Sequence, residues 1–105
     1  MLGSKFNLPP AVTSAVSNLV DRVDGPQLNS LTSALQDVGS GNYTEALTNF
    51  RSLTQQLPQE GILHWFKGAL ELKEGQAVQA QSDLKQAQQL DGKLPDFSSL
   101  LSLLK

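Results

Sequence analysis

The chain alternates between segments with apolar residues at helical spacing and short polar breaks that contain Gly or Pro. Within each segment the apolar residues recur three or four positions apart, which places them on one face of an α-helix. No segment shows sustained alternation of apolar and polar residues, the pattern of a half-buried strand. We therefore predict an all-α fold without a sheet. Its six helices are expected at about residues 10–23, 27–38, 43–57, 59–74, 76–90 and from 95 onward.

The pattern repeats along the chain at an offset of 34 residues. Small residues then fall on small residues, apolar residues fall on apolar or small ones, and the same turn glycine recurs between two helical segments. A fixed period of this length is typical of helical-repeat proteins. The nine matched pairs are Leu28/Ile62, Leu31/Trp65, Ala34/Gly68, Leu35/Ala69, Val38/Leu72, Gly41/Gly75, Ala46/Ala80, Phe50/Leu84 and Leu53/Ala87.

Residues 41–58 resemble the second half of a tetratricopeptide repeat. In that pattern a glycine turns the chain, a small residue lets two helices approach closely, and an aromatic residue fills the space beside it. The matching positions here are Gly41, Tyr43, Ala46, Phe50, Leu53 and Pro58. The first half of each copy is shorter than in the family, because two residues instead of three precede the turn glycine.

The resemblance implies a short right-handed array of antiparallel helical hairpins in a single domain, residues 1–105. Residues 1–25 would form an N-terminal flanking helix, 26–58 the first repeat, 59–94 the second repeat and 95–105 a C-terminal capping helix. The function implied is a non-enzymatic protein–protein interaction module, an adaptor or a small chaperone. Such a module would hold a helical or extended peptide segment in a concave groove.

The segment 59–74 is apolar on two faces, which predicts a helix buried on two sides. In the family the first helix of each repeat lines the groove. By resemblance the partner-binding residues would be Asn29, Thr32 and Gln36 in the first repeat and Leu63, Phe66, Leu70 and Lys73 in the second. The alternative is that the C-terminal helix folds back and covers the three apolar members of this set.

The length, the charged share and the net charge of the chain bear on its domain count and on its partners. The 105 residues fit one domain. Charged residues make up only 17% of the chain, and eleven glutamines provide much of its polar surface instead. The net charge of −2 and the absence of a basic run argue against nucleic acid and membrane as partners. Charged residues of the fourth segment, Lys67, Glu71, Lys73 and Glu74, look like solvated pairs on a helix face.

No chemistry of its own is expected for this chain. It has no cysteine and one histidine, His64, which we interpret as an ordinary, partly buried side chain. No nucleophile motif, phosphate loop or metal-ligand spacing is present. We therefore predict that the protein is not an enzyme, has no cofactor or metal and takes no small-molecule substrate.

The sequence also bears on the cellular location and the oligomeric state of the protein. The absence of cysteine, of a signal-peptide pattern and of a long apolar stretch leads us to expect a soluble, cytoplasmic protein. The alternative function is a structural, self-associating domain, a homo-oligomer that dimerises through the Leu-rich C-terminal helix of residues 95–105.

Overall fold

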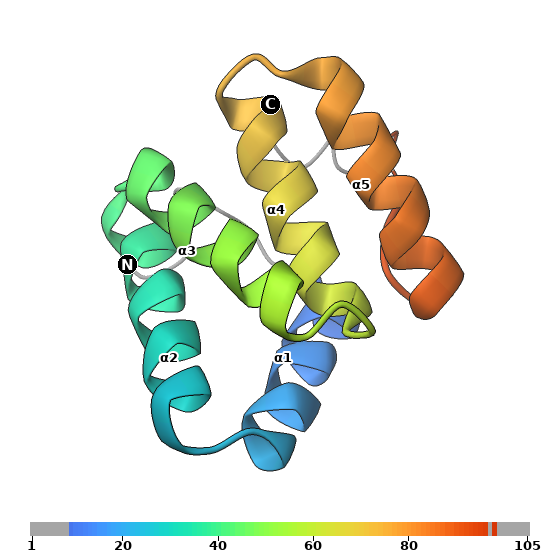
Figure 1. The fold of residues 1–105 in the computed structure, drawn as a ribbon. Helices are drawn as coiled ribbons and strands as arrows, with labels where there is room; N and C mark the ends of the chain where they lie inside the picture. Colours follow the sequence, from blue (N-terminus) through green and yellow to red (C-terminus); the bar gives the residue numbers. More distant parts are fainter. Residues whose placement is uncertain (1–8, 97, 99–105) are drawn as a thin grey trace.

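Five helices make up the fold in the computed structural model, which describes residues 9–96 and residue 98 (Figure 1). They are α1 (Pro10–Arg22), α2 (Gly25–Ser40), α3 (Tyr43–Gln56), α4 (Gly61–Lys73) and α5 (Ala77–Leu90). The described residues contain no strand, so the predicted all-α class is confirmed. Most of the predicted sixth helix falls on residues outside the described ranges. None of the five observed helices is long and apolar enough to cross a membrane.

Two hairpins, α2–α3 and α4–α5, turn in the same way. Gly41 ends α2 with a φ of 84°, a left-handed conformation that glycine adopts without steric cost. The N–H of Asn42 then donates to the carbonyl of Asp37 at 2.8 Å. The turn around Gly75, 34 residues later, has a φ of 81° and repeats this bond at 2.8 Å. The sequence repeat is thus a repeat of local structure as well.

The period also reaches back to α1. Helices α1, α3 and α5 end at Arg22, Gln56 and Leu90, which are 34 residues apart. In each case the N–H of the next residue donates to the carbonyl four positions earlier, at 3.1, 2.8 and 2.8 Å. Helix α1, which we expected only as a flanking helix, therefore has the register of the second helix of a hairpin.

Helix α4 is the central helix of the fold. It packs against α5, α3 and α1, and ten of its thirteen residues are buried. On the α3 side the ring of Phe66 stacks on that of Phe50, with centroids 4.9 Å apart. Elsewhere the Nε1–H of Trp65 donates to the carbonyl of Pro95 at 3.2 Å. The prediction that residues 59–74 form a helix buried on two sides is confirmed.

Helices α4 and α5 approach closely because small residues line their contact. A Cβ at Gly61 would lie 3.0 Å from the carbonyl oxygen of Ala87, and one at Gly68 would lie 3.2 Å from that of Ala80. These distances are shorter than ordinary van der Waals contacts of a Cβ. The two glycines therefore set the separation of the second hairpin.

The structure differs from the sequence expectations in two local details. Helix α2 begins at Gly25, because Pro26 lies in its first turn, where the missing N–H costs no hydrogen bond. Helix α5 begins at Ala77, one residue later than expected, and Ala77 is exposed there. The inward face of α5 instead begins at Ala80 and includes Asp83 and Leu84.

Candidate functional site

The four polar members of the predicted partner-binding set are on the surface. Asn29, Thr32 and Gln36 are exposed along one stretch of α2, and Lys73 is exposed at the end of α4. The ammonium of Lys73 lies 5.1 Å from the centroid of the Tyr43 ring, within the range of a cation–π interaction. All four side chains can be reached by another molecule.

The three apolar members of that set are in the core. Leu63, Phe66 and Leu70 each have an exposed fraction of 0%. One side of this cluster is closed by α3, whose Phe50 stacks on Phe66. These residues therefore do not line an open groove in this conformation, because a guest chain would have to displace part of the core to touch them. The structure does not bring the seven predicted residues together into one surface.

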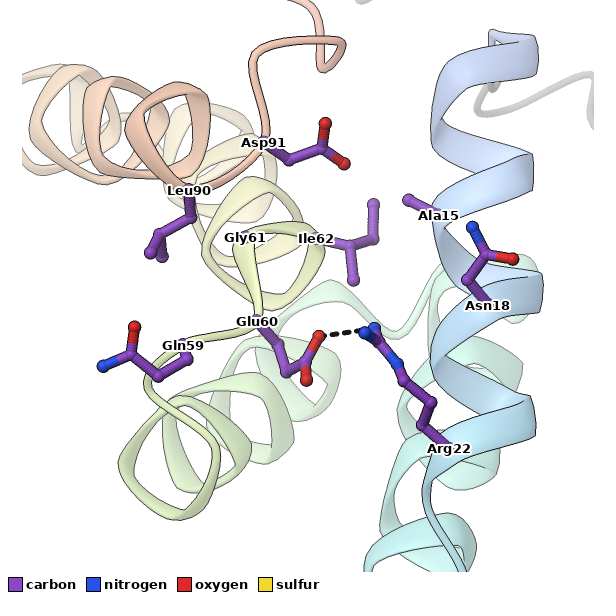
Figure 2. A pocket seen from close by; sticks show the side chains of 9 residues that line it. All are labelled: Ala15, Asn18, Arg22, Gln59, Glu60, Gly61, Ile62, Leu90 and Asp91. Carbon is purple, nitrogen blue, oxygen red and sulfur yellow. Dashed lines mark hydrogen bonds and ion pairs between the residues drawn. The ribbon is translucent and has the colours of Figure 1, made fainter.

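A polar groove runs instead between α1 and the corner formed by α4 and α5 (Figure 2). One half has a volume of about 200 Å³ and the other about 290 Å³, and Ala15, Asn18 and Asp91 line both halves. The α1 wall is a single stripe at helical spacing. It consists of Pro10, Ala11, Ser14, Ala15, Asn18 and Arg22. The facing wall comes from the 59–62 and 90–93 segments.

An ion pair spans one end of this groove. The guanidinium of Arg22, in the last turn of α1, donates to the Glu60 carboxylate at 2.6 Å (Figure 2). Glu60 directly precedes α4, where a negative charge is favoured by the helix dipole. The side chains are 55% and 23% exposed, so the pair is accessible to water and to a partner. The groove thus offers amide, hydroxyl and charged groups, and no large apolar pocket.

A second polar cluster is buried between α4 and α5, contrary to the prediction of solvated charge pairs on this helix face. Glu71 is 2% exposed and Asp83 is 9% exposed, so Glu71 is not a solvated surface charge. Lys67 is half-buried, and its ammonium lies 3.3 Å from a carboxylate oxygen of Asp83. Burial, followed by the neighbouring Asp83 carboxyl, raises the pKa of Glu71 to about 8.

The repeat held the signal that finds this cluster. At the offset of 34, Glu71 corresponds to Asp37 and Asp83 corresponds to Asn49. In the first hairpin these residues form an interhelical hydrogen bond, in which the Asn49 amide donates to Asp37 at 3.1 Å. A polar residue three positions after the small alanine in both copies marks an inward polar pair.

His64 has a structural place in α4. It is 6% exposed, and its Nε2 lies 2.9 Å from the carbonyl oxygen of Pro58. Since a carbonyl only accepts, Nε2 carries the proton in this contact. The histidine therefore ties α4 to the loop that precedes it, and it is more deeply buried than we expected.

Within residues 9–96 and 98, no group of three or more acidic, histidine or cysteine side chains is arranged to hold a metal ion. Comparison with protein-family models, with curated proteins and with solved structures finds no match to this chain.

Proposed function

We propose that this domain is a non-enzymatic protein–protein interaction module, an adaptor or small chaperone built as a short tetratricopeptide-like array, which holds a polypeptide segment on its surface. The observation that carries the proposal is the polar groove along α1, lined by residues from three helices and two connecting segments. Its two halves together have the size of a small ligand site.

The chemistry of the groove favours an extended, polar guest segment. Asn18 and Gln59 can pair with backbone N–H and C=O groups, since an amide side chain both donates and accepts. Opposite charges at Arg22 and Glu60 lie at one end of the groove, Lys93 lies in its other half, and Asp91 lines both halves. A neutral or mixed-charge segment is therefore preferred over a strongly basic or acidic one.

The exposed face of α2 supports a second contact surface. Asn29, Thr32 and Gln36 lie outside the groove lining, yet they offer the same amide and hydroxyl groups. Lys73 adds one positive charge at the end of α4.

The test is selection of binding peptides from a displayed random library, followed by titration against three variants. Ser14→Tyr/Asn18→Tyr fills the groove, and Thr32→Tyr/Gln36→Tyr alters the α2 face. Thr13→Tyr/Ser17→Tyr is the matched control, because both residues are exposed on α1 and neither lines the groove.

We expect peptides that bind the wild type and the control with equal affinity and bind the groove variant at least tenfold more weakly. Loss at the α2 variant alone would move the binding surface to α2. Peptides that bind all three variants equally, or no selectable peptide at all, would contradict the proposal.

A further inference from the structure

The two hairpins place an interhelical polar pair at the same position, but only the pair in the second hairpin needs a bound proton to form a hydrogen bond. In the first hairpin Asp37 of α2 accepts from the amide of Asn49 of α3 at 3.1 Å, so a carboxylate meets a donor. In the second hairpin the side chain of Glu71 of α4 contacts that of Asp83 of α5. Two ionised carboxylates are both acceptors, so they can form a hydrogen bond only if one of them carries a proton.

The second pair is also the more deeply buried one. Glu71 and Asp83 are 2% and 9% exposed, whereas Asp37 and Asn49 are half-buried. One carboxyl oxygen of Glu71, Oε1, is buried without a hydrogen-bond partner. Removing an ionised carboxylate from water without pairing it is costly, so the site favours the neutral form of Glu71.

We propose that Glu71 and Asp83 share one proton in the folded α4–α5 hairpin, and that loss of this proton destabilises the packing of α4 against α5. The α2–α3 hairpin has no such pH-sensitive pair at the corresponding position. This device goes beyond the binding function proposed above. It is independent of the α1 groove, whose lining includes neither carboxyl.

The charges around the pair oppose the effect only in part. Lys67 of α4 faces Asp83 at 3.3 Å, and Arg51 of α3 lowers the pKa of Glu71. Arg51 also lies 3.4 Å from the side-chain oxygen of Gln76, in the turn between the two helices. Burial and Asp83 outweigh both cations, and the net effect raises the pKa of Glu71 to about 8.

Two other titratable groups near α4 are held elsewhere. His64, two turns before Glu71, contacts the carbonyl of Pro58, and Arg22 of α1 pairs with Glu60 at the opposite end of the helix.

The direction of the pH dependence follows from this pKa. An unfolded chain releases the Glu71 proton near pH 4.5, whereas the folded chain keeps it up to about pH 8. Between these values the folded state binds the extra proton, so stability falls as pH rises. The stabilisation that this proton provides is fully present below pH 4.5 and is lost above about pH 8. One proton corresponds to at most a tenfold change in the unfolding equilibrium constant per pH unit, about 1.4 kcal/mol.

The experiment compares urea unfolding from pH 5 to pH 9 in the wild type, Glu71→Gln, Asp83→Asn and the control Glu74→Gln. Glu74 is exposed directly after the end of α4, where it accepts a hydrogen bond from the Thr44 hydroxyl, so its substitution makes the same chemical change outside the pair. We expect the wild type and the control to lose stability in parallel between pH 5.5 and 7.5. Glu71→Gln should flatten this slope and be the more stable protein at pH 8.5.

Asp83→Asn keeps the test decisive if Glu71→Gln does not fold. It gives the second hairpin the amide donor that Asn49 supplies in the first, so it should also flatten the slope. A carbon-13 NMR titration of the wild type adds a direct measurement, in which the Glu71 carboxyl should titrate well above pH 4.5. Equal slopes in all four proteins, or titration of that carboxyl near pH 4.5, would overturn the proposal.

Discussion

Gly68 of α4 lies directly against Leu84 of α5. A Cβ placed on Gly68 would come 2.8 Å from Cγ of Leu84 and 3.1 Å from its Cδ2. Leu84 is 1% exposed, so it has little room to move away. The second hairpin therefore depends on a missing side chain at one position as much as on the apolar side chains around it.

Gly68→Ala should destabilise the fold by about 1–3 kcal/mol, the usual cost of an added methyl group in a packed core. The matched control is Gly39→Ala, because Gly39 is also helical but has no atom within 4 Å of the added Cβ. There alanine should stabilise by about 0.5–1 kcal/mol through its better helix propensity. Urea unfolding of both variants measures the two free energies. Equal and small effects would show that α5 shifts freely to admit the methyl group.

A second prediction concerns the stacked rings of α3 and α4. Phe50 and Phe66 are both fully buried, and their ring planes differ by only 7°. Phe50→Ala should cost about 3–5 kcal/mol, enough to unfold a marginal domain. The milder pair Phe50→Leu and Phe66→Leu permits a double-mutant cycle, in which we expect a coupling free energy of about 0.5–1.5 kcal/mol.

The control for this cycle pairs Phe50→Leu with Leu19→Val. Leu19 is equally buried but lies on α1, which packs mainly against α4. A coupling free energy as large in the control cycle as in the ring cycle would contradict a specific role for the stacked pair.

Most of the fold was predictable because helical periodicity is visible in one dimension. The apolar spacing placed all five described helices, and the glycine at positions 41 and 75 placed both hairpin turns. Periodicity shows which faces of a helix are apolar, but it does not name the neighbour that covers them. Periodicity therefore leaves two interpretations of Leu63 and Phe66, an open groove or a cover by the C-terminal helix, and the structure buries both residues in the core.

The candidate site was less predictable for a different reason. A groove forms where two surfaces fail to touch, so it depends on the placement of α1 against the α4–α5 corner. No single residue along α1 signals it. The Glu71–Asp83 pair is in principle visible in the sequence, since Asp83 falls on the inward face of α5 between Ala80 and Ala87. The charge of Glu71 predicts a solvated position instead, and the burial of Glu71 contradicts this prediction.

The ion pair between Arg22 and Glu60 should contribute little to stability. Arg22 is 55% exposed, and exposed pairs typically contribute about 0–1 kcal/mol. Arg22→Gln should therefore shift the unfolding free energy by less than about 1 kcal/mol at low salt. The shift should vanish near 1 M salt, where charges are screened over about 3 Å. A loss that persists at high salt would instead assign the effect to packing of the long side chain.

The two hairpin turns should respond alike to the same substitution. Gly41 and Gly75 have φ values of 84° and 81°, and the hydrogen bonds that close the two turns both measure 2.8 Å. An alanine in this left-handed region costs about 1–2 kcal/mol, so Gly41→Ala and Gly75→Ala should destabilise by similar amounts. Asparagine should cost less at both, because it tolerates this conformation better than alanine.

Gly92→Ala is the control for this comparison, because Gly92 has no positive φ and the nearest atom to its added Cβ is 4.0 Å away. It should change the unfolding free energy by less than about 0.5 kcal/mol. Urea unfolding at one pH compares all these variants. If Gly41→Ala and Gly75→Ala differed by several-fold, the two turns would not be energetically equivalent. The 34-residue period would then describe the shape of the chain without describing how its stability is distributed.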